Sequence, residues 1–197
     1  MENLKRMADD QLVTLYLQGN NSAFDVLLKR HQSRLFNYIY FLVRSREVAE
    51  DLFQETFVKA IVTLQQGRYV NDNKFSAWIT RIAHNLVIDQ FRVERNENLI
   101  SNDETEFDIF NDAKLSEGNI ENSMVNDQVL KDVRALVDEL PDCQREVVFM
   151  RYYQDMSFKE IADITGVSIN TALGRMRYAV MNMRRIADEK SISLVME

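Results

Sequence analysis

The chain has 197 residues, of which 46% are hydrophobic and 28% are charged, and its formal net charge is −7. This composition excludes wholesale disorder, and no apolar run approaches the roughly 20 residues that a membrane-spanning helix needs. The N-terminus lacks the apolar core of a signal peptide, and one cysteine and two histidines exclude an internal disulfide and a zinc cluster. We therefore expect a cytoplasmic protein without membrane insertion, metal site or cofactor.

Glycine and proline are scarce, with five and one residues respectively. Both are far below their average usage of about 7% and 5%. Sheets need frequent tight turns, in which glycine and proline are favoured, so their scarcity indicates long helices. The predicted fold class is all-α.

Most of the negative charge lies in residues 96–127, which hold nine acidic residues and a single basic one, Lys114. This stretch is rich in Asn, Asp, Glu and Ser and has no sustained helical period, which is typical of a flexible linker. We predict two small helical domains, residues 1–95 and 128–190, joined by this acidic linker and followed by a tail over 191–197. A solvated tether with no other role is one of two open interpretations of the linker, and a functional role is the other.

Apolar spacing in the first domain predicts helices over residues 11–18, 23–44 and 46–67. Their expected N-terminal caps are Asp9 or Asp10 for the first helix, Ser22 for the second and Ser45 for the third. His31 lies in the second helix without another metal ligand nearby, so we interpret it as an ordinary packing or surface histidine.

The third of these helices carries polar acceptors on one face. Asp51, Gln54 and Glu55 are three and four residues apart, so their side chains point to the same patch of space. Like charges at this spacing mildly destabilise a helix, which favours a role in binding a basic partner. A solvated acidic face without a partner is the alternative.

A further helix over residues 74–95 is predicted to combine a buried stripe with a mixed stripe on another side. The mixed stripe consists of Lys74, Trp78, Arg81, Asn85 and Arg92. Cations bind phosphates, an aromatic face stacks on an unpaired base, and an amide can read a base edge, so the stripe is suited to strand-separated DNA. A tryptophan at the boundary of a core, among exposed basic residues, is the alternative.

The second domain contains a helix-turn-helix pattern over residues 158–177. Ser157 and Glu160 form a capping box, Gly166 supplies the turn, and Ser168 caps the following helix. That helix carries four arginines and no acidic residue through residue 187, which favours binding to the major groove of duplex DNA over a purely structural hairpin. Its candidate DNA-binding residues are Asn170, Thr171, Leu173, Gly174, Arg175, Arg177 and Tyr178.

Three segments together, residues 49–60, 74–92 and 140–179, resemble a bacterial RNA polymerase sigma factor of the small, two-domain extracytoplasmic-function (ECF) type. The resemblance implies that the face of Asp51, Gln54 and Glu55 binds core polymerase, mainly its β′ subunit. It implies that the 74–92 helix and the loop before it capture the melted minus-ten element of promoter DNA, with Asn85 helping to hold a flipped-out base. The helix-turn-helix would read the minus-thirty-five element.

The resemblance therefore predicts a non-catalytic bacterial subunit that directs polymerase to specific promoters and helps to melt them. It implies that the acidic linker threads the nucleic-acid channel of the polymerase, and that regulation comes from outside, for example from an anti-sigma factor. The recognition helix departs from the usual pattern at Leu173, Gly174 and Tyr178, where the family usually has a basic residue, serine and arginine. Base specificity therefore cannot be carried over.

Two alternative functions explain less of the sequence. A free-standing helix-turn-helix regulator, acting as a dimer on a palindrome, would explain the second domain but would leave Asp51–Glu55 and the Trp78 stripe without a role. An enzyme would need a nucleophile–base pair, a phosphate-binding loop or a metal cluster, and the sequence offers none of them. We expect no catalytic residues.

Overall fold

The computed structural model describes residues 2–70, 74–99 and 133–192, and every regular element within these residues is a helix. The predicted all-α class is confirmed. The chain divides into two compact units, Met1–Asp103 and Glu104–Glu197. No helix in the described residues is long and apolar enough to cross a bilayer.

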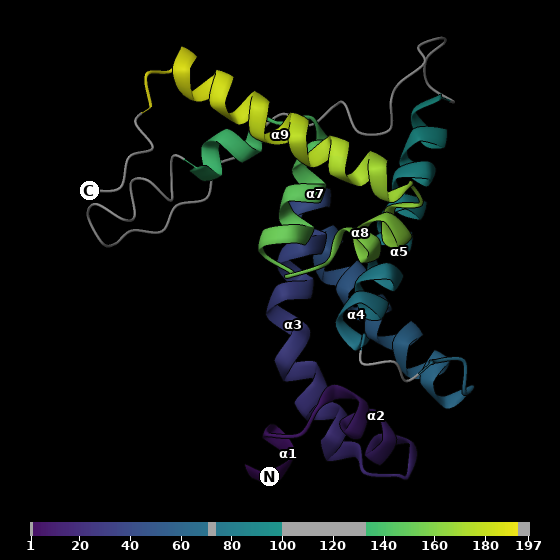
Figure 1. The fold of residues 1–197 in the computed structure, drawn as a ribbon. Coiled ribbons are helices and arrows are strands. Elements are labelled where there is room, and N and C mark those ends of the chain that lie inside the picture. The colour runs from purple at the N-terminus through teal and green to yellow at the C-terminus, as the bar shows by residue number, and fades with distance from the viewer. Residues whose placement is uncertain (1, 71–73, 100–132, 193–197) are drawn as a thin grey trace. The chain divides into compact units, whose positions relative to one another are not determined.

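The first unit contains five helices within its described residues, coloured purple to teal in Figure 1. They are α1 (Glu2–Lys5), α2 (Asp9–Leu17), α3 (Asn21–Val43), α4 (Arg46–Gln65) and α5 (Phe75–Leu99). The long helix α3 packs against α2, α4 and α5 and so forms the centre of the unit. Its core is built from the apolar stripes of these helices. The largest fully buried side chains include Leu12, Leu27, Leu35, Tyr38, Ile39, Leu64, Phe75 and Ile79.

Helix α5 continues to Leu99, so the first residues of the expected linker are helical. The residues after Gln90 contain neither glycine nor proline until well beyond this point, so no local signal ends the helix earlier. The rest of the linker, residues 100–127, lies outside the described part of the chain. The domain boundaries stay a prediction.

Only one of the three expected caps in the first unit is confirmed. The Ser45 hydroxyl accepts a hydrogen bond from the Val48 amide at 3.4 Å and caps α4. The caps expected for α2 and α3 are wrong, because Ala8 occupies the cap position of α2 and Asn20 that of α3. Asp9 and Asp10 do not cap, because their carboxylates bind side chains from other elements.

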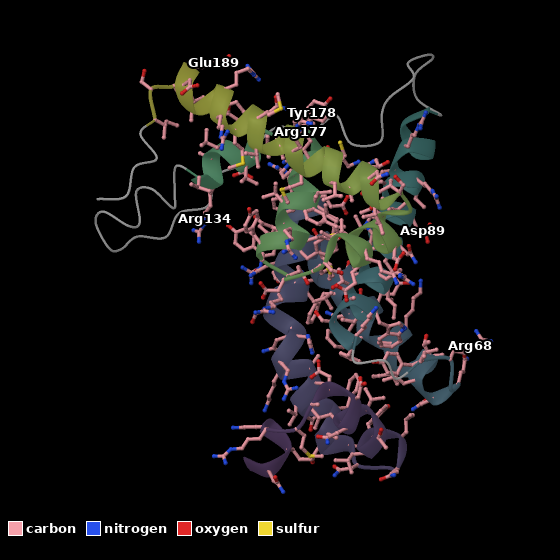
Figure 2. All side chains as sticks on the ribbon, viewed as in Figure 1. Arg68, Asp89, Arg134, Arg177, Tyr178 and Glu189 are labelled. Atoms are coloured by element: carbon pink, nitrogen blue, oxygen red, sulfur yellow. The ribbon has the colours of Figure 1, made fainter. Side chains whose placement is uncertain are left out.

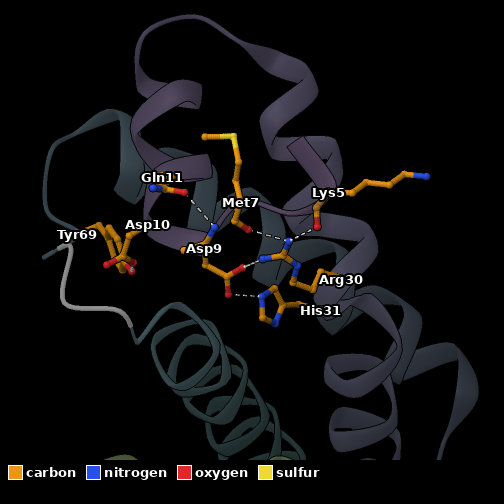
Figure 3. Close-up of polar contacts among 9 residues, drawn as sticks. Lys5, Met7, Asp9, Asp10, Gln11, Arg30, His31 and Tyr69 are labelled. Atoms are coloured by element: carbon orange, nitrogen blue, oxygen red, sulfur yellow. Dashed lines mark hydrogen bonds and ion pairs between the residues drawn. The ribbon is translucent and has the colours of Figure 1, made fainter. Parts of the chain in front are cut away.

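Asp9 joins the start of α2 to the middle of α3 (Figure 3). Its Oδ2 accepts a hydrogen bond from His31 Nε2 at 2.7 Å, and its other oxygen forms an ion pair with Arg30. Arg30 also donates to the carbonyl groups of Lys5 and Met7, at 3.1 and 3.0 Å. Burial alone would raise the pKa of Asp9, but the hydrogen bonds and charges of His31 and Arg30 outweigh it and lower the pKa.

Replacing Asp9 with asparagine should destabilise the protein by about 1.5–3 kcal/mol, the usual range for hydrogen bonds to charged groups. The unfolded pKa of aspartate is about 3.9, and the folded value is lower. The stabilisation is therefore complete above about pH 4 and is lost as the pH falls through the folded value. Urea unfolding at pH 7 and at pH 3 measures this difference. If D9N lowers the free energy of unfolding by the same amount at pH 3 and at pH 7, the ionised carboxylate of Asp9 is not the source of the stabilisation.

The second unit contains helical residues 133–138 and three further helices, α7 (Asp142–Tyr152), α8 (Phe158–Thr165) and α9 (Ile169–Glu189). Helix α9, drawn in yellow-green and yellow in Figure 1, packs against α7 and α8. Asn182 on α9 donates to the Gln144 side chain on α7 at 2.8 Å. The buried side chains of this unit include Leu136, Met150, Ile161, Ala172, Ala179 and Ile186.

The helix-turn-helix is formed by α8 and α9, and its three predicted signals are confirmed. The Ser157 amide donates to Glu160 Oε2 at 2.9 Å, while the Glu160 amide donates to the Ser157 hydroxyl at 3.3 Å. Gly166 ends α8 with a φ of +68°, a left-handed conformation that glycine adopts without strain. Ser168 caps α9 by accepting from the Thr171 amide at 3.0 Å.

Candidate nucleic-acid and protein interfaces

The acidic face of α4 is exposed as predicted. Asp51, Gln54 and Glu55 all lie on the outside of the helix, opposite the side that packs in the core. Glu55 forms an ion pair with Lys59, one turn further along, at 3.1 Å. Both of these side chains are about half exposed, so the pair is screened by water and leaves the face negative.

Two apolar residues extend this face and were missed in the sequence. Val58 and Val62 are 60% and 44% exposed, and they follow Asp51 by seven and eleven residues, which places them on the same side of α4. The exposed face is therefore acidic in its first half and apolar in its second half. Its signal in the sequence was the helical spacing of two valines that the core stripe does not use.

The mixed stripe of α5 also reaches the surface. Lys74, Arg81, Asn85 and Arg92 are exposed, whereas Trp78 is half-buried. The buried neighbour of Asn85 explains this orientation. His84 Nδ1 forms a hydrogen bond with the Tyr38 hydroxyl on α3 at 3.0 Å, which turns the next residue, Asn85, outward.

Arg92 has a partner that the sequence interpretation overlooked. Asp89 lies three residues before it on the same side of α5, and the two side chains form an ion pair at 3.0 Å. Figure 2 labels Asp89 on this helix. Asp89 weakens the positive charge at the end of the stripe, so Lys74 and Arg81 are the stronger candidates for phosphate contacts. The spacing of three residues could have indicated the pair.

Trp78 belongs to a cluster of aromatic rings and is also open to solvent on part of its surface. Its ring centroid lies 4.7 Å from that of Tyr69 and 5.5 Å from that of Phe75. Phe75 is only 1% exposed and anchors the cluster in the core. The ring contacts agree with the packing interpretation of the tryptophan, and the exposed part of the ring leaves the binding interpretation a prediction. Tyr69 was not predicted as part of this site.

The candidate reading face of α9 divides into exposed and partly buried residues. Asn170, Thr171, Leu173, Arg177 and Tyr178 are exposed, and Gly174 and Arg175 are partly buried. Figure 2 labels Arg177 and Tyr178 on this helix. The Thr171 hydroxyl lies 2.8 Å from that of Ser168, so Thr171 takes part in the helix cap. A Cβ added at Gly174 would meet no other atom within 4 Å, so packing does not require glycine at this position.

No group of three or more His, Cys, Asp or Glu side chains in the described residues is arranged to hold a metal ion. The exposed candidate residues form three surfaces, which we name the α4 face (Asp51, Gln54, Glu55, Val58 and Val62), the α5 stripe (Lys74, Trp78, Arg81, Asn85 and Arg92) and the α9 reading face. Such surfaces can bind a protein, single-stranded nucleic acid and duplex nucleic acid, respectively.

Comparison with known protein families gives two matches, one in each unit. Residues 27–97 match the family Sigma-70 region 2, and residues 130–176 match Sigma-70, region 4. The first match contains the α4 face and the α5 stripe, and the second contains α8 and the first part of α9.

Similar curated proteins cover most of the chain. The RNA polymerase sigma-H factor of Pseudomonas aeruginosa is 28% identical over 181 residues, which cover 88% of this chain and 90% of that protein. The ECF RNA polymerase sigma factor SigW of Bacillus subtilis is 25% identical over 162 residues, which cover 81% of this chain and 86% of that protein.

Solved structures share the fold. The structure of CnrH in complex with the cytosolic domain of CnrY has a TM-score of 0.63 at 24% identity and covers 93% of this chain and 99% of CnrH. The sigma factor RpoE from Bartonella quintana, solved with the anti-sigma factor NepR, has a TM-score of 0.61 at 22% identity and covers 84% of this chain and 96% of RpoE. With both region families matched in order and full-length relatives of one kind, the chain belongs to the ECF-type RNA polymerase sigma factors.

Proposed function

We propose that this protein binds the RNA polymerase core, directs it to specific promoters and helps to melt the minus-ten region so that transcription starts. The observation that carries the proposal is the presence of three exposed surfaces of different chemistry on the two matched regions. In this proposal the protein is a non-catalytic specificity subunit that acts in the bacterial cytoplasm, and the polymerase forms the phosphodiester bonds.

Each surface has its own role in this function. The α4 face binds the core, mainly the β′ subunit, because its acidic half suits a basic surface. The α5 stripe captures the separated strand of the minus-ten element, with Trp78 stacking on a base and Asn85 reading its edge. The α9 reading face enters the major groove at the minus-thirty-five element.

We propose an anti-sigma factor as a further partner. The structure of CnrH is a complex with the cytosolic domain of CnrY, and that of RpoE is a complex with the anti-sigma factor NepR. A protein of this kind would regulate the sigma factor from outside the chain.

The function is tested with purified protein and purified core polymerase. We expect the two to comigrate on gel filtration, and the complex to give run-off transcripts from a subset of a random promoter library. Dimeric binding to a palindrome without polymerase, together with no comigration, would instead favour a free-standing regulator.

The chemistry of α9 predicts how the upstream element is read. Leu173 is 44% exposed and apolar, and Gly174 has no side chain, so neither can form the bidentate contact of arginine with guanine. We expect contacts with A·T pairs and DNA shape to dominate. Leu173→Arg should shift the selected motif toward G at one position, by about 1–3 kcal/mol of discrimination.

Selection of promoters from a random library measures this shift. Met181→Arg is the control, because it adds the same charge at an exposed position two turns further along α9 and should leave base preference unchanged. If the wild-type protein already selects a guanine at that position, and Leu173→Arg leaves the motif unaltered, the assigned register of the reading face is wrong.

A further inference from the structure

Tyr69 connects three elements of the first unit. Its hydroxyl donates a hydrogen bond to Asp10 Oδ1 on α2 at 3.2 Å, across 59 residues of sequence (Figure 3). Its ring forms an edge contact with Trp78 on α5, with centroids 4.7 Å apart, and lies 6.1 Å from Phe75. One side chain in the segment between α4 and α5 therefore contacts both the start of α2 and the start of the α5 stripe.

The contacts of Asp9 and Asp10 belong to one closed circuit of side-chain contacts. Asp9 binds His31, and the His31 ring lies 5.2 Å from that of Phe75. Phe75 contacts Tyr69, and Tyr69 returns to α2 through Asp10. His31 and Phe75 are buried, so the core fixes this part of the circuit of contacts. Tyr69 is the partly buried residue of this circuit, and it connects the buried residues to the surface.

The exposure of the residues beside Tyr69 shows why its hydrogen bond to Asp10 matters. Arg68 and Val70 are exposed, Val70 by 75%, so neither neighbour holds the segment against the helices by burial. A tyrosine ring without a bond at its hydroxyl can swing about two side-chain torsions. The hydrogen bond to Asp10 limits this motion and so holds the Tyr69 ring against the indole of Trp78 before any ligand arrives. Such preorganisation lowers the entropy lost on binding.

We propose that Tyr69 and Asp10 are positioning residues for the capture of an unpaired promoter base. Asp10 acts through Tyr69, and Tyr69 fixes the ring plane of Trp78, on which the base stacks. This inference rests on the proposed function of the α5 stripe and assigns a role in it to α2, which lies outside the matched region 2 family.

The test uses the reconstituted holoenzyme with Tyr69→Phe, Asp10→Ala and the double variant. Tyr69→Phe retains the ring and removes only the hydroxyl. Each single variant should slow promoter opening, followed by permanganate reactivity, by about 2- to 10-fold, the range expected for one hydrogen bond. The double variant should be no slower than the slower single variant, because both changes remove the same interaction. Asp10→Asn, which retains an acceptor oxygen, should restore most of the rate.

The matched control is Tyr16→Phe. Tyr16 also packs against an aromatic ring, that of Phe24 at 4.9 Å, and its hydroxyl also takes part in a side-chain hydrogen bond, here as the acceptor from Gln65 at 3.4 Å. Among the ring pairs of the described residues, Tyr16 contacts neither Tyr69 nor Trp78, so Tyr16→Phe should leave opening unchanged. Core affinity and closed-complex affinity should be equal in all variants.

Two results would overturn the inference alone, while the wild-type holoenzyme still opens its promoter. One is opening that is insensitive to Tyr69→Phe or is slowed equally by Tyr16→Phe. The other is a double variant whose effect is the product of the single effects, which would show that Asp10 and Tyr69 act independently. A wild-type protein that binds no core polymerase would instead overturn the proposed function, and this inference with it.

Discussion

Reversal of both charges on the α4 face, as D51K and E55K together, should reduce affinity for core polymerase by at least about 100-fold. Close charge pairs across interfaces contribute about 1.5–7 kcal/mol each, and every 1.4 kcal/mol is a factor of ten. Both side chains are exposed, so the change replaces attraction by repulsion without disturbing the core of the unit. Fluorescence anisotropy with labelled protein measures the affinity, and circular dichroism reports whether helicity is retained.

The control for this double variant is D25K with D188K. Asp25 on α3 and Asp188 on α9 are both exposed and lie outside the three proposed surfaces, so this variant changes the net charge by the same amount. It should bind core polymerase within about twofold of the wild-type protein, because surface charges away from the contact act only through the screened long-range field. Equal affinity of D51K/E55K and wild type would remove the α4 face from the polymerase interface.

Trp78→Ala should lower the yield of open complex by about 5- to 150-fold, because one base–aromatic stacking contact is worth about 1–3 kcal/mol. Closed-complex binding should change much less, since duplex recognition is assigned to α9. The substitution also removes ring contacts with Tyr69 and Phe75, so the free energy of unfolding must be measured beside promoter opening.

Two further variants separate stacking from packing. Trp78→Phe retains an aromatic face and should recover most of the opening activity. Asn85→Ala, at an exposed position, should relax discrimination at one promoter base without destabilising the fold. If permanganate reactivity of the melted thymines is the same in Trp78→Ala and wild type, the α5 stripe is a structural feature only.

The helix-turn-helix could be predicted in detail because its signals are local. The capping bonds of Ser157 and Ser168 reach only three residues along the chain, and the left-handed Gly166 follows directly from the lack of a side chain. The exposure of the α5 stripe and of Asp51, Gln54 and Glu55 follows from the period of the helix. Which residues of a helix are exposed can be predicted from the spacing of its apolar residues alone.

The contacts of Asp9, Asp10 and Tyr69 were not predicted, because they join residues that lie far apart in the chain. Aspartate is a residue type favoured at helix caps, so Asp9 and Asp10 were expected to cap. Their carboxylates instead bind Arg30, His31 and Tyr69, which are 21 to 59 residues distant in the chain. Tyr69 lies in a segment without helical period, so no local pattern distinguishes it from its neighbours. Its contribution to the Trp78 surface becomes visible only when three elements are packed together.

Gly174 leaves room for change on the α9 reading face. It lies inside a helix, and no atom would obstruct an added Cβ, so replacement by alanine should stabilise the second unit by about 1 kcal/mol. The scaffold thus tolerates new side chains at a position that faces DNA in the proposed function. Promoter preference can therefore be exchanged at this position, in evolution or in the laboratory, without a compensating change elsewhere in the domain.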